Sequence, residues 1–166
     1  MIQKRGKIEF RVIHDHDREF LFRLFASTRE WEFQVTIWPE DEKQAFLKHQ
    51  FEAQDASYKM LNLGAIHRIV QLDGVDIGRL IVDRQDDQMR IIDLSLLTEY
   101  RGRGIGTDIL RSLLNEAHGG KVPVRLHVEK QSPALNLYLR HGFRKIGDTG
   151  HHYAMEWNPA TGPREI

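Results

Sequence analysis

The 166-residue sequence contains no cysteine, which excludes a disulfide scaffold, a cysteine-ligated zinc site and a cysteine nucleophile. Its 24 basic and 24 acidic residues cancel, so no net charge attracts the chain to nucleic acid or to an anionic membrane. It has no apolar run near the roughly 20 residues that span a bilayer, and the N-terminus lacks the apolar segment of a signal peptide. We therefore expect a cytoplasmic protein with neither a nucleic-acid nor a membrane partner.

The remaining composition is ordinary for a globular protein, with 40% hydrophobic and 29% charged residues. A chain of this length can bury one sizeable core. No internal repeat, low-complexity tract or linker interrupts the sequence. We therefore expect a single domain over residues 1–166.

Apolar periodicity and turn residues predict an alternation of strands and helices in the order β-α-α-β-β-β-α-β-α-β-β. The predicted strands are residues 8–13, 65–71, 75–82, 89–97, 122–128, 143–146 and 153–157; the predicted helices are 15–27, 39–58, 108–118 and 133–140. Asp15 is expected to cap the first helix, and Gly119-Gly120 to end the third. The second helix is expected to turn one stripe inward, formed by Ala45, Phe46, His49, Gln50 and Ala53.

The most informative segment is Arg101-Gly102-Arg103-Gly104-Ile105-Gly106-Thr107, which lies between a predicted strand and a predicted helix. Glycines let backbone N–H groups approach a ligand closely. The helix that follows directs its unpaired N–H groups and the positive end of its dipole toward this loop. The segment therefore predicts an anion site, and phosphate is the anion that such sites commonly bind.

Two motifs in this order resemble the GNAT superfamily of N-acetyltransferases. Arg101–Gly106 fits the acetyl-CoA motif (Q/R)-x-x-G-x-(G/A), and Ser132–Phe143 looks like the signature N-x-A-x-x-L-Y-x-x-x-G-F. The resemblance implies an α/β (α+β) fold with a mixed, mostly antiparallel sheet of about seven strands and about four flanking helices. It also implies two splayed parallel strands at the cofactor site. One departure is Ser132, which stands where the family commonly has asparagine.

By this resemblance the chain transfers an acetyl group from acetyl-CoA, a cosubstrate, without a metal. The residues that the resemblance assigns to acetyl-CoA lie on the strand before the loop, in the loop itself and on the last helix: Leu96, Leu97, Arg101, Gly102, Arg103, Gly104, Ile105, Gly106, Thr107, Ser132 and Tyr138. The N–H of Leu96 or of a neighbour would polarise the thioester carbonyl.

Tyr138 matches the family tyrosine that acts as general acid to the CoA sulfur, although a packed aromatic side chain is the alternative. Two residues are candidates for the general base, Asp93 and His127. Asp93 could instead be a solvent-facing or sheet-paired carboxylate, His127 could be structural, and water could relay the proton.

The acceptor is expected to be a primary amine on a small molecule or a peptide. Trp31, Phe33 and Trp38 lie in the connection that borders the acceptor site in the family, and they serve either this pocket or the core. A Rossmann enzyme would need differently spaced glycines early in the chain, and a P-loop NTPase needs a string that is absent. A non-catalytic CoA sensor or protein-interaction module is the remaining alternative. Family members are often dimers, so a homodimer is also expected, with no surface indicated for it.

Overall fold

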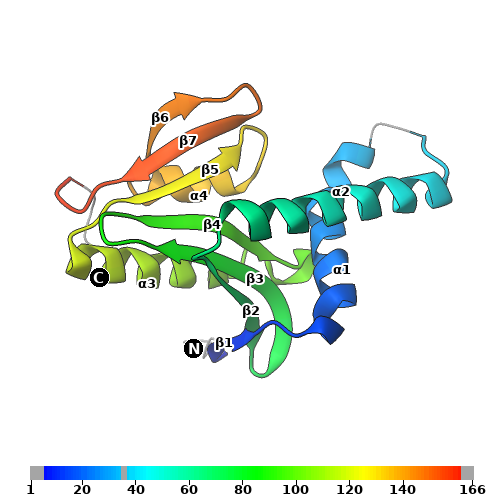
Figure 1. Ribbon diagram of the computed structural model, residues 1–166, viewed down its shortest axis with the longest axis horizontal. Helices are drawn as coiled ribbons and strands as arrows, with labels where there is room; N and C mark the ends of the chain where they lie inside the picture. Colours follow the sequence, from blue (N-terminus) through cyan, green and yellow to red (C-terminus); the bar gives the residue numbers. More distant parts are fainter. Residues whose placement is uncertain (1–5, 35–36, 162–166) are drawn as a thin grey trace. The chain divides into compact units, whose positions relative to one another are not determined.

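The structure, a computed structural model, describes residues 6–34 and 37–161. The strands within this part of the chain are β1 (Ile8–Val12), β2 (Ile66–Leu72), β3 (Val75–Arg84), β4 (Met89–Leu96), β5 (Val124–Glu129), β6 (Arg144–Asp148) and β7 (His152–Trp157) (Figure 1). The α-helices are α1 (Arg18–Thr28), α2 (Glu40–Leu61), α3 (Ile105–Gly120) and α4 (Ala134–Arg140), joined by short 3-10 turns η1 (Asp15–Asp17), η2 (Glu30–Phe33) and η3 (Thr98–Tyr100).

The strands form a sheet in the order β1-β2-β3-β4-β5-β7-β6. The β4–β5 pair is parallel, whereas β1 with β2, β5 with β7, and β6 with β7 are antiparallel. This confirms the predicted sheet and the order of elements. Two compact units make up the chain, one from Met1–Ile81 and Asp93–Gly102 and the other from Val82–Ile92 and Arg103–Ile166.

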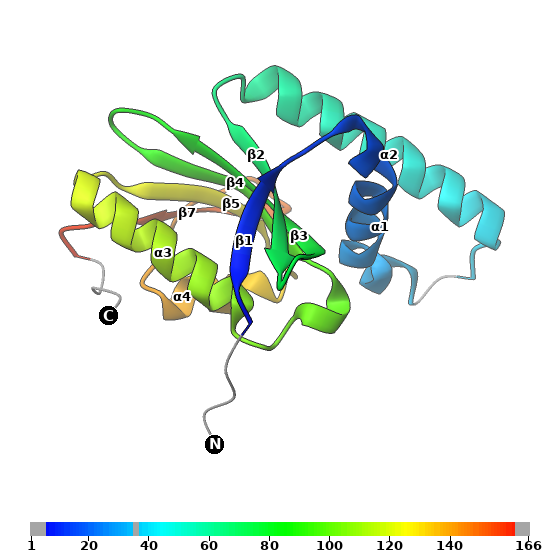
Figure 2. The ribbon, with the colours of Figure 1, turned by 90° about the horizontal axis from the view of Figure 1, so that it is seen from below.

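The core of the first unit forms where α1 packs against α2 (Figures 1 and 2). Leu21 and Phe25 of α1 meet Leu47 and Phe51 of α2, and each is at most 8% exposed. Burying such a side chain contributes about 2 kcal/mol. The β2–β3 hairpin turns at Asp73 and Gly74, whose φ angles of 49° and 82° are typical of a two-residue turn.

The second unit is built around the buried face of α3, where apolar residues recur three and four positions apart: Ile105, Ile109, Leu110, Leu113, Leu114 and Ala117. On β5, Val124, Leu126 and Val128 are buried, while the alternate residues Arg125 and His127 are exposed. The short helix α4 packs against β5, as both ribbon views show.

Three predictions about helix ends and faces are wrong. Asp15 lies inside η1, and Asp17 supplies the capping carboxylate by accepting the His14 N–H at 2.8 Å. Helix α3 continues through Gly119-Gly120 and ends at Lys121, whose φ of 56° is left-handed. Gly119 and Gly120 are still helical, because the left-handed residue that ends α3 is the next one, Lys121.

The predicted inward stripe of α2 is also wrong, because Ala45, Phe46, His49 and Ala53 are exposed. The buried residues are Leu47 and Phe51, one turn apart, which lie on a neighbouring face of the helix. Charged residues lie on all sides of α2, so the pattern of apolar residues in its sequence does not identify the buried face clearly. None of the helices in residues 6–34 and 37–161 is long and apolar enough to cross a membrane.

Candidate active site

The parallel pairing of β4 with β5 in the second unit is short. It runs from Met89↔Val124 to Ile91↔Leu126, whereas β5 stays paired with β7 as far as Glu129↔His152. After Leu126, the residues of β5 therefore pair with β7 and have no register partner on β4. A strand edge that leaves its ladder exposes N–H and C=O groups, which an extended ligand can use.

The end of β4, in the first unit, is pressed closely against β3. A Cβ on Gly78 would overlap the Ser95 carbonyl oxygen and the Leu96 side chain, so only glycine fits at this position. The Leu97 N–H donates to Ile77 O at 2.8 Å, so it faces β3. Because successive residues of a strand face opposite edges, the Leu96 N–H points away from β3. This is the orientation that a carbonyl-polarising N–H requires.

Arg101 is engaged within the first unit. Its Nε donates to Leu96 O at 2.8 Å, and Nη2 lies 3.4 Å from both Ser27 O and Ser27 Oγ. The Arg101 backbone N–H donates to Thr98 O at 3.2 Å. The side chain thus joins the end of β4 to the end of α1. Its predicted contact with an anion stays a prediction, and the structure gives it a positioning role.

The glycine loop has the backbone that its sequence requires. Gly102 and Gly104 have φ angles of 70° and 81°, in the left-handed region that favours glycine. A Cβ on Gly102 would meet no atom within 4 Å, and one on Gly106 would meet Leu137 Cδ2 at 3.7 Å. The glycines therefore serve conformation and access rather than tight internal packing.

The first turn of α3 has no side chain on its N-cap, because Gly104 occupies that position. The first intrahelical bond is donated by Asp108 N to Gly104 O, at 3.0 Å. The N–H groups of Ile105, Gly106 and Thr107 come before this bond, so the helix itself gives them no acceptor. This arrangement fits a phosphate group, which would accept from these donors at the positive end of the helix dipole.

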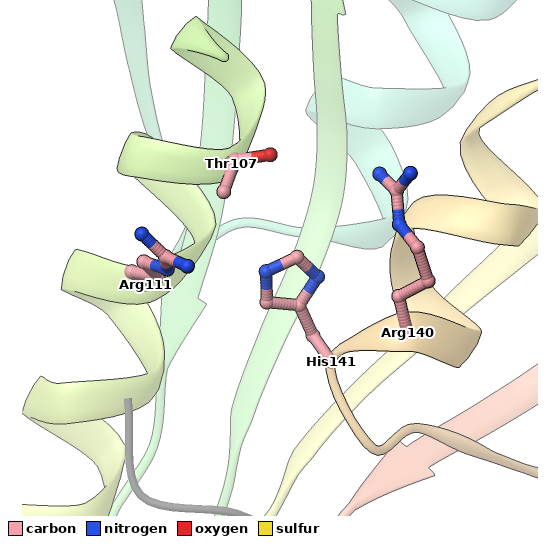
Figure 3. A pocket seen from close by; sticks show the side chains of 4 residues that line it. All are labelled: Thr107, Arg111, Arg140 and His141. Atoms are coloured by element: carbon pink, nitrogen blue, oxygen red, sulfur yellow. The ribbon is translucent and has the colours of Figure 1, made fainter. Parts of the chain in front are cut away.

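A pocket of about 430 Å³ continues from this turn. Thr107 and Arg111 line it from α3, and Arg140 and His141 line it from the end of α4 (Figure 3). Sequence reasoning missed Arg111, Arg140 and His141. The spacing of four residues between Thr107 and Arg111, which puts both on one helix face, was the available signal for one of them.

Tyr138 is 5% exposed on α4, with its ring edge-on to Phe143 at a centroid distance of 5.4 Å. Its carbonyl accepts the N–H of His141 and of Phe143, both at 3.1 Å, and Gly142 between them has a φ of 89°. This helix ending fixes the turn on which Tyr138 lies. Ser132 Oγ accepts the Ala134 N–H at 3.2 Å, in the manner of a helix-capping hydroxyl.

The two candidate bases have different surroundings. Asp93 Oδ2 accepts from Arg79 Nε at 2.7 Å and from Ser95 Oγ at 3.2 Å, and Arg79 is buried. His127 is exposed, and its register partner on β7 is the small residue Ala154. Asp93 is thus held in an ion pair within the sheet, whereas His127 is open to solvent.

The aromatic residues between α1 and α2 are shared between core and surface. Phe33 packs against the first unit's core and contacts Trp38 and Phe46 at ring distances of 5.9 and 6.1 Å. Trp31 and Trp38 remain 41% and 43% exposed. No group of three metal-binding side chains is present within the residues that the structure describes.

A family model for the acetyltransferase (GNAT) domain matches residues 64–145. Over 163 residues the chain is 32% identical to N-alpha-acetyltransferase 50 of Danio rerio, with 94% of this chain and 85% of that protein covered. The chain belongs to the GNAT family of acetyltransferases. It is therefore an acetyl-CoA-dependent N-acetyltransferase, which confirms the resemblance that the two motifs indicated.

Two further similarities concern a segment of the sequence and the fold. The GNAT chain is 39% identical over 56 residues to N-alpha-acetyltransferase RimI of Mycobacterium tuberculosis (strain ATCC 25618 / H37Rv), covering 34% of this chain and 35% of that protein. It has the fold of PaiA N-acetyltransferase from Thermoplasma acidophilum, solved in complex with coenzyme A. The TM-score is 0.68 at 20% identity, over 92% of this chain and 99% of that one.

Proposed function

We propose that this GNAT enzyme transfers the acetyl group of acetyl-CoA to the α-amino group of a peptide or protein N-terminus. The uncapped first turn of α3 behind a glycine loop carries the cofactor part of the proposal. The acceptor part is supported by the two curated relatives, both of which are N-alpha-acetyltransferases. We further propose that both compact units form one catalytic domain, because the family model spans residues of each.

The residues present fit acetyl-CoA. The N–H groups of Ile105, Gly106 and Thr107, together with Arg103, would hold the pyrophosphate. The part of β5 after Leu126, which pairs with β7 but has no register partner on β4, would accept the pantetheine arm as an added strand. Bound in this way, acetyl-CoA would supply a thioester whose carbonyl carbon an amine can attack.

Three groups of the chain would share the chemistry. The Leu96 N–H would donate to the carbonyl oxygen as negative charge develops on it. His127, directly or through one water, would take a proton from the attacking amine. The Tyr138 hydroxyl would give its proton to the departing sulfur, as the new C–N bond replaces the C–S bond. No covalent acyl-enzyme is needed, so transfer is direct within a ternary complex.

Asp93 and Ser132 take other roles in this proposal. Asp93 would remain the ion-pair partner of Arg79, which joins β3 to β4 near the reacting carbonyl. Ser132 would act as the cap of α4, since its hydroxyl already accepts the Ala134 N–H. Leu97 and Gly102 would contribute backbone shape beside the cofactor rather than side-chain contacts.

Two measurements test the proposal in sequence. Isothermal titration with acetyl-CoA should give saturable binding, and absence of binding at millimolar cofactor would overturn the acetyltransferase assignment. Thiol release is then measured with peptides whose α-amino group is free or blocked. Turnover only with free N-termini supports the proposal, whereas turnover with blocked peptides carrying lysine would assign the ε-amino group instead. Binding without any turnover would favour a CoA sensor.

A further inference from the structure

The pocket beside the glycine loop has a composition suited to an anion. Two arginines, one histidine and one hydroxyl line it, all from the second unit. Asp108 follows Thr107 on α3 but is not among the lining residues. A cavity of about 430 Å³ with this lining is large enough for a phosphate group together with part of a sugar.

His141 is the most constrained of the four lining residues. It is 7% exposed, and its Nδ1 lies 2.7 Å from Leu137 O. Because a carbonyl oxygen can only accept, Nδ1 donates this hydrogen bond, which fixes the orientation of the ring. Figure 3 shows the imidazole between the guanidinium groups of Arg111 and Arg140. A buried ring held in this way is a preorganised contact rather than a solvated surface histidine.

The position of the pocket limits which anion it could bind. Thr107 belongs both to the first turn of α3 and to the pocket lining, so the two sites adjoin. Acetyl-CoA carries a pyrophosphate and, on its ribose, a separate phosphomonoester. The backbone donors of the first turn suit the pyrophosphate. A monoester with close to two negative charges needs cationic side chains, which the pocket supplies from two helices.

We propose that Thr107, Arg111, Arg140 and His141 bind the ribose 3′-phosphate of acetyl-CoA and make the enzyme discriminate against 3′-dephospho-acetyl-CoA. This inference rests on the proposed function, since it assigns one more part of the same cosubstrate. The guanidinium groups of Arg140 and Arg111 supply the positive charge, and the imidazole of His141 lies between them (Figure 3). The pocket thus adds selectivity among nucleotide thioesters, which the loop backbone alone would not provide.

The test compares two ligands across matched variants by isothermal titration. Wild-type protein should bind acetyl-CoA about 10- to 100-fold more tightly than 3′-dephospho-acetyl-CoA, the range expected for charge-assisted hydrogen bonds. Arg140→Gln should weaken acetyl-CoA binding and leave the dephospho ligand nearly unchanged, so that the ratio falls at least threefold, roughly half a decade. Arg144→Gln removes an exposed arginine outside the pocket lining, and it should keep the wild-type ratio.

The possible failures are distinguishable. If wild-type protein binds neither ligand, the proposed function itself fails. If it binds both equally, or if Arg140→Gln and Arg111→Gln each keep the wild-type ratio, the phosphate assignment alone is overturned. A variant that weakens both ligands by the same factor would place the arginine at the pyrophosphate, which also contradicts the inference. Thermal unfolding of each variant checks that these exposed substitutions leave the fold intact.

Discussion

Three arginines of the first unit and two of the second have contrasting surroundings. In the first unit Arg11 binds Asp17 and Asp76, Arg79 binds Asp93, and Arg101 binds Leu96 O. These three side chains connect strands and helices to one another. In the second unit two arginines, Arg111 and Arg140, line a cavity. The sequence shows arginine in both places, and only the structure shows which side chains join strands and helices and which line the pocket.

This difference corresponds to two parts of the proposed acetyl transfer, which are polarisation of the thioester carbonyl and binding of the cofactor. The first unit fixes the end of β4, where the Leu96 N–H is oriented away from β3. The second unit presents the uncapped first turn of α3 and the basic pocket. Substitutions in the glycine loop and in the basic pocket should therefore change cofactor affinity, whereas those in the first unit should change stability or turnover.

The largest effect is expected from Gly104→Val. Gly104 has a φ of 81°, which a β-branched residue adopts only with strain, and its added side chain would enter the anion loop. We expect acetyl-CoA affinity to fall by more than about 100-fold, measured by titration. Gly74→Val is the matched control, because Gly74 has a φ of 82° in the other unit. Normal acetyl-CoA affinity in folded Gly104→Val would contradict the placement of the phosphate cradle.

Tyr138→Phe should lower kcat by about 100-fold and leave the Kd for acetyl-CoA nearly unchanged, because general acid catalysis contributes a factor of that order. The measurement is steady-state turnover with a free-N-terminus peptide, alongside titration of the cofactor. Tyr153→Phe, on β7, serves as a tyrosine control with wild-type turnover expected. An unchanged kcat in Tyr138→Phe would show that Tyr138 is not the general acid.

Arg11→Met should destabilise the fold by about 2 kcal/mol, because it leaves the buried Asp17 without its partner. Hydrogen bonds from Arg11 lower the pKa of Asp17 and of Asp76 below the ordinary carboxyl value. Their contribution is thus present above about pH 4 and is lost as the pH falls through the lowered values. Chemical unfolding at several pH values should show a steeper acid loss in wild type than in Arg11→Met. If stability fell equally with decreasing pH in both proteins, the ion pairs of Arg11 with Asp17 and Asp76 would not have this role.

Arg101→Gln should lower kcat by about tenfold, since the Arg101 Nε–Leu96 O hydrogen bond positions the residue that polarises the carbonyl. Acetyl-CoA affinity should change by less than about threefold, in contrast to Arg140→Gln. Titration and turnover on the same preparation give both values. A loss confined to affinity would show that Arg101 contacts the cofactor instead.

His67→Gln should have the smallest effect, under about 1 kcal/mol, because His67 is partly exposed. Burial, with the nearby charge of Arg79 as a second cause, lowers the pKa of His67. The folded state therefore resists protonation, and stability falls as the pH decreases below the ordinary histidine value of about 6.5. The variant should flatten this part of the stability profile. A profile identical to wild type would contradict the assignment.

The sequence predicted the motif-bearing elements of the second unit well. Glycines with a required backbone, such as Gly104 and Gly142, are visible as residue types, and alternating apolar residues marked β5. The face of α2 and the cap of α1 were not predictable in the same way. The charge-rich sequence of α2 fits several faces. Asp15 and Asp17 are the same residue type, and only the contact with Arg11 of β1 distinguishes Asp17.

The candidate site likewise has parts that the sequence predicts and parts that it does not. The anion loop follows from local sequence, because its backbone conformation is set by its own glycines. The role of Arg101 and the pairing of Asp93 depend on contacts with residues distant in sequence, Ser27 and Arg79. The basic pocket likewise joins α3 to the end of α4, so it becomes visible only once those helices are placed.

The most direct test is mass spectrometry of a peptide library incubated with acetyl-CoA and the wild-type protein, with Tyr138→Phe in parallel. We expect one added acetyl group on the α-amino nitrogen, formed by the wild-type protein and strongly reduced in the variant. Absence of acetylation in the presence of demonstrated acetyl-CoA binding, or acetylation confined to side-chain amines, would contradict it.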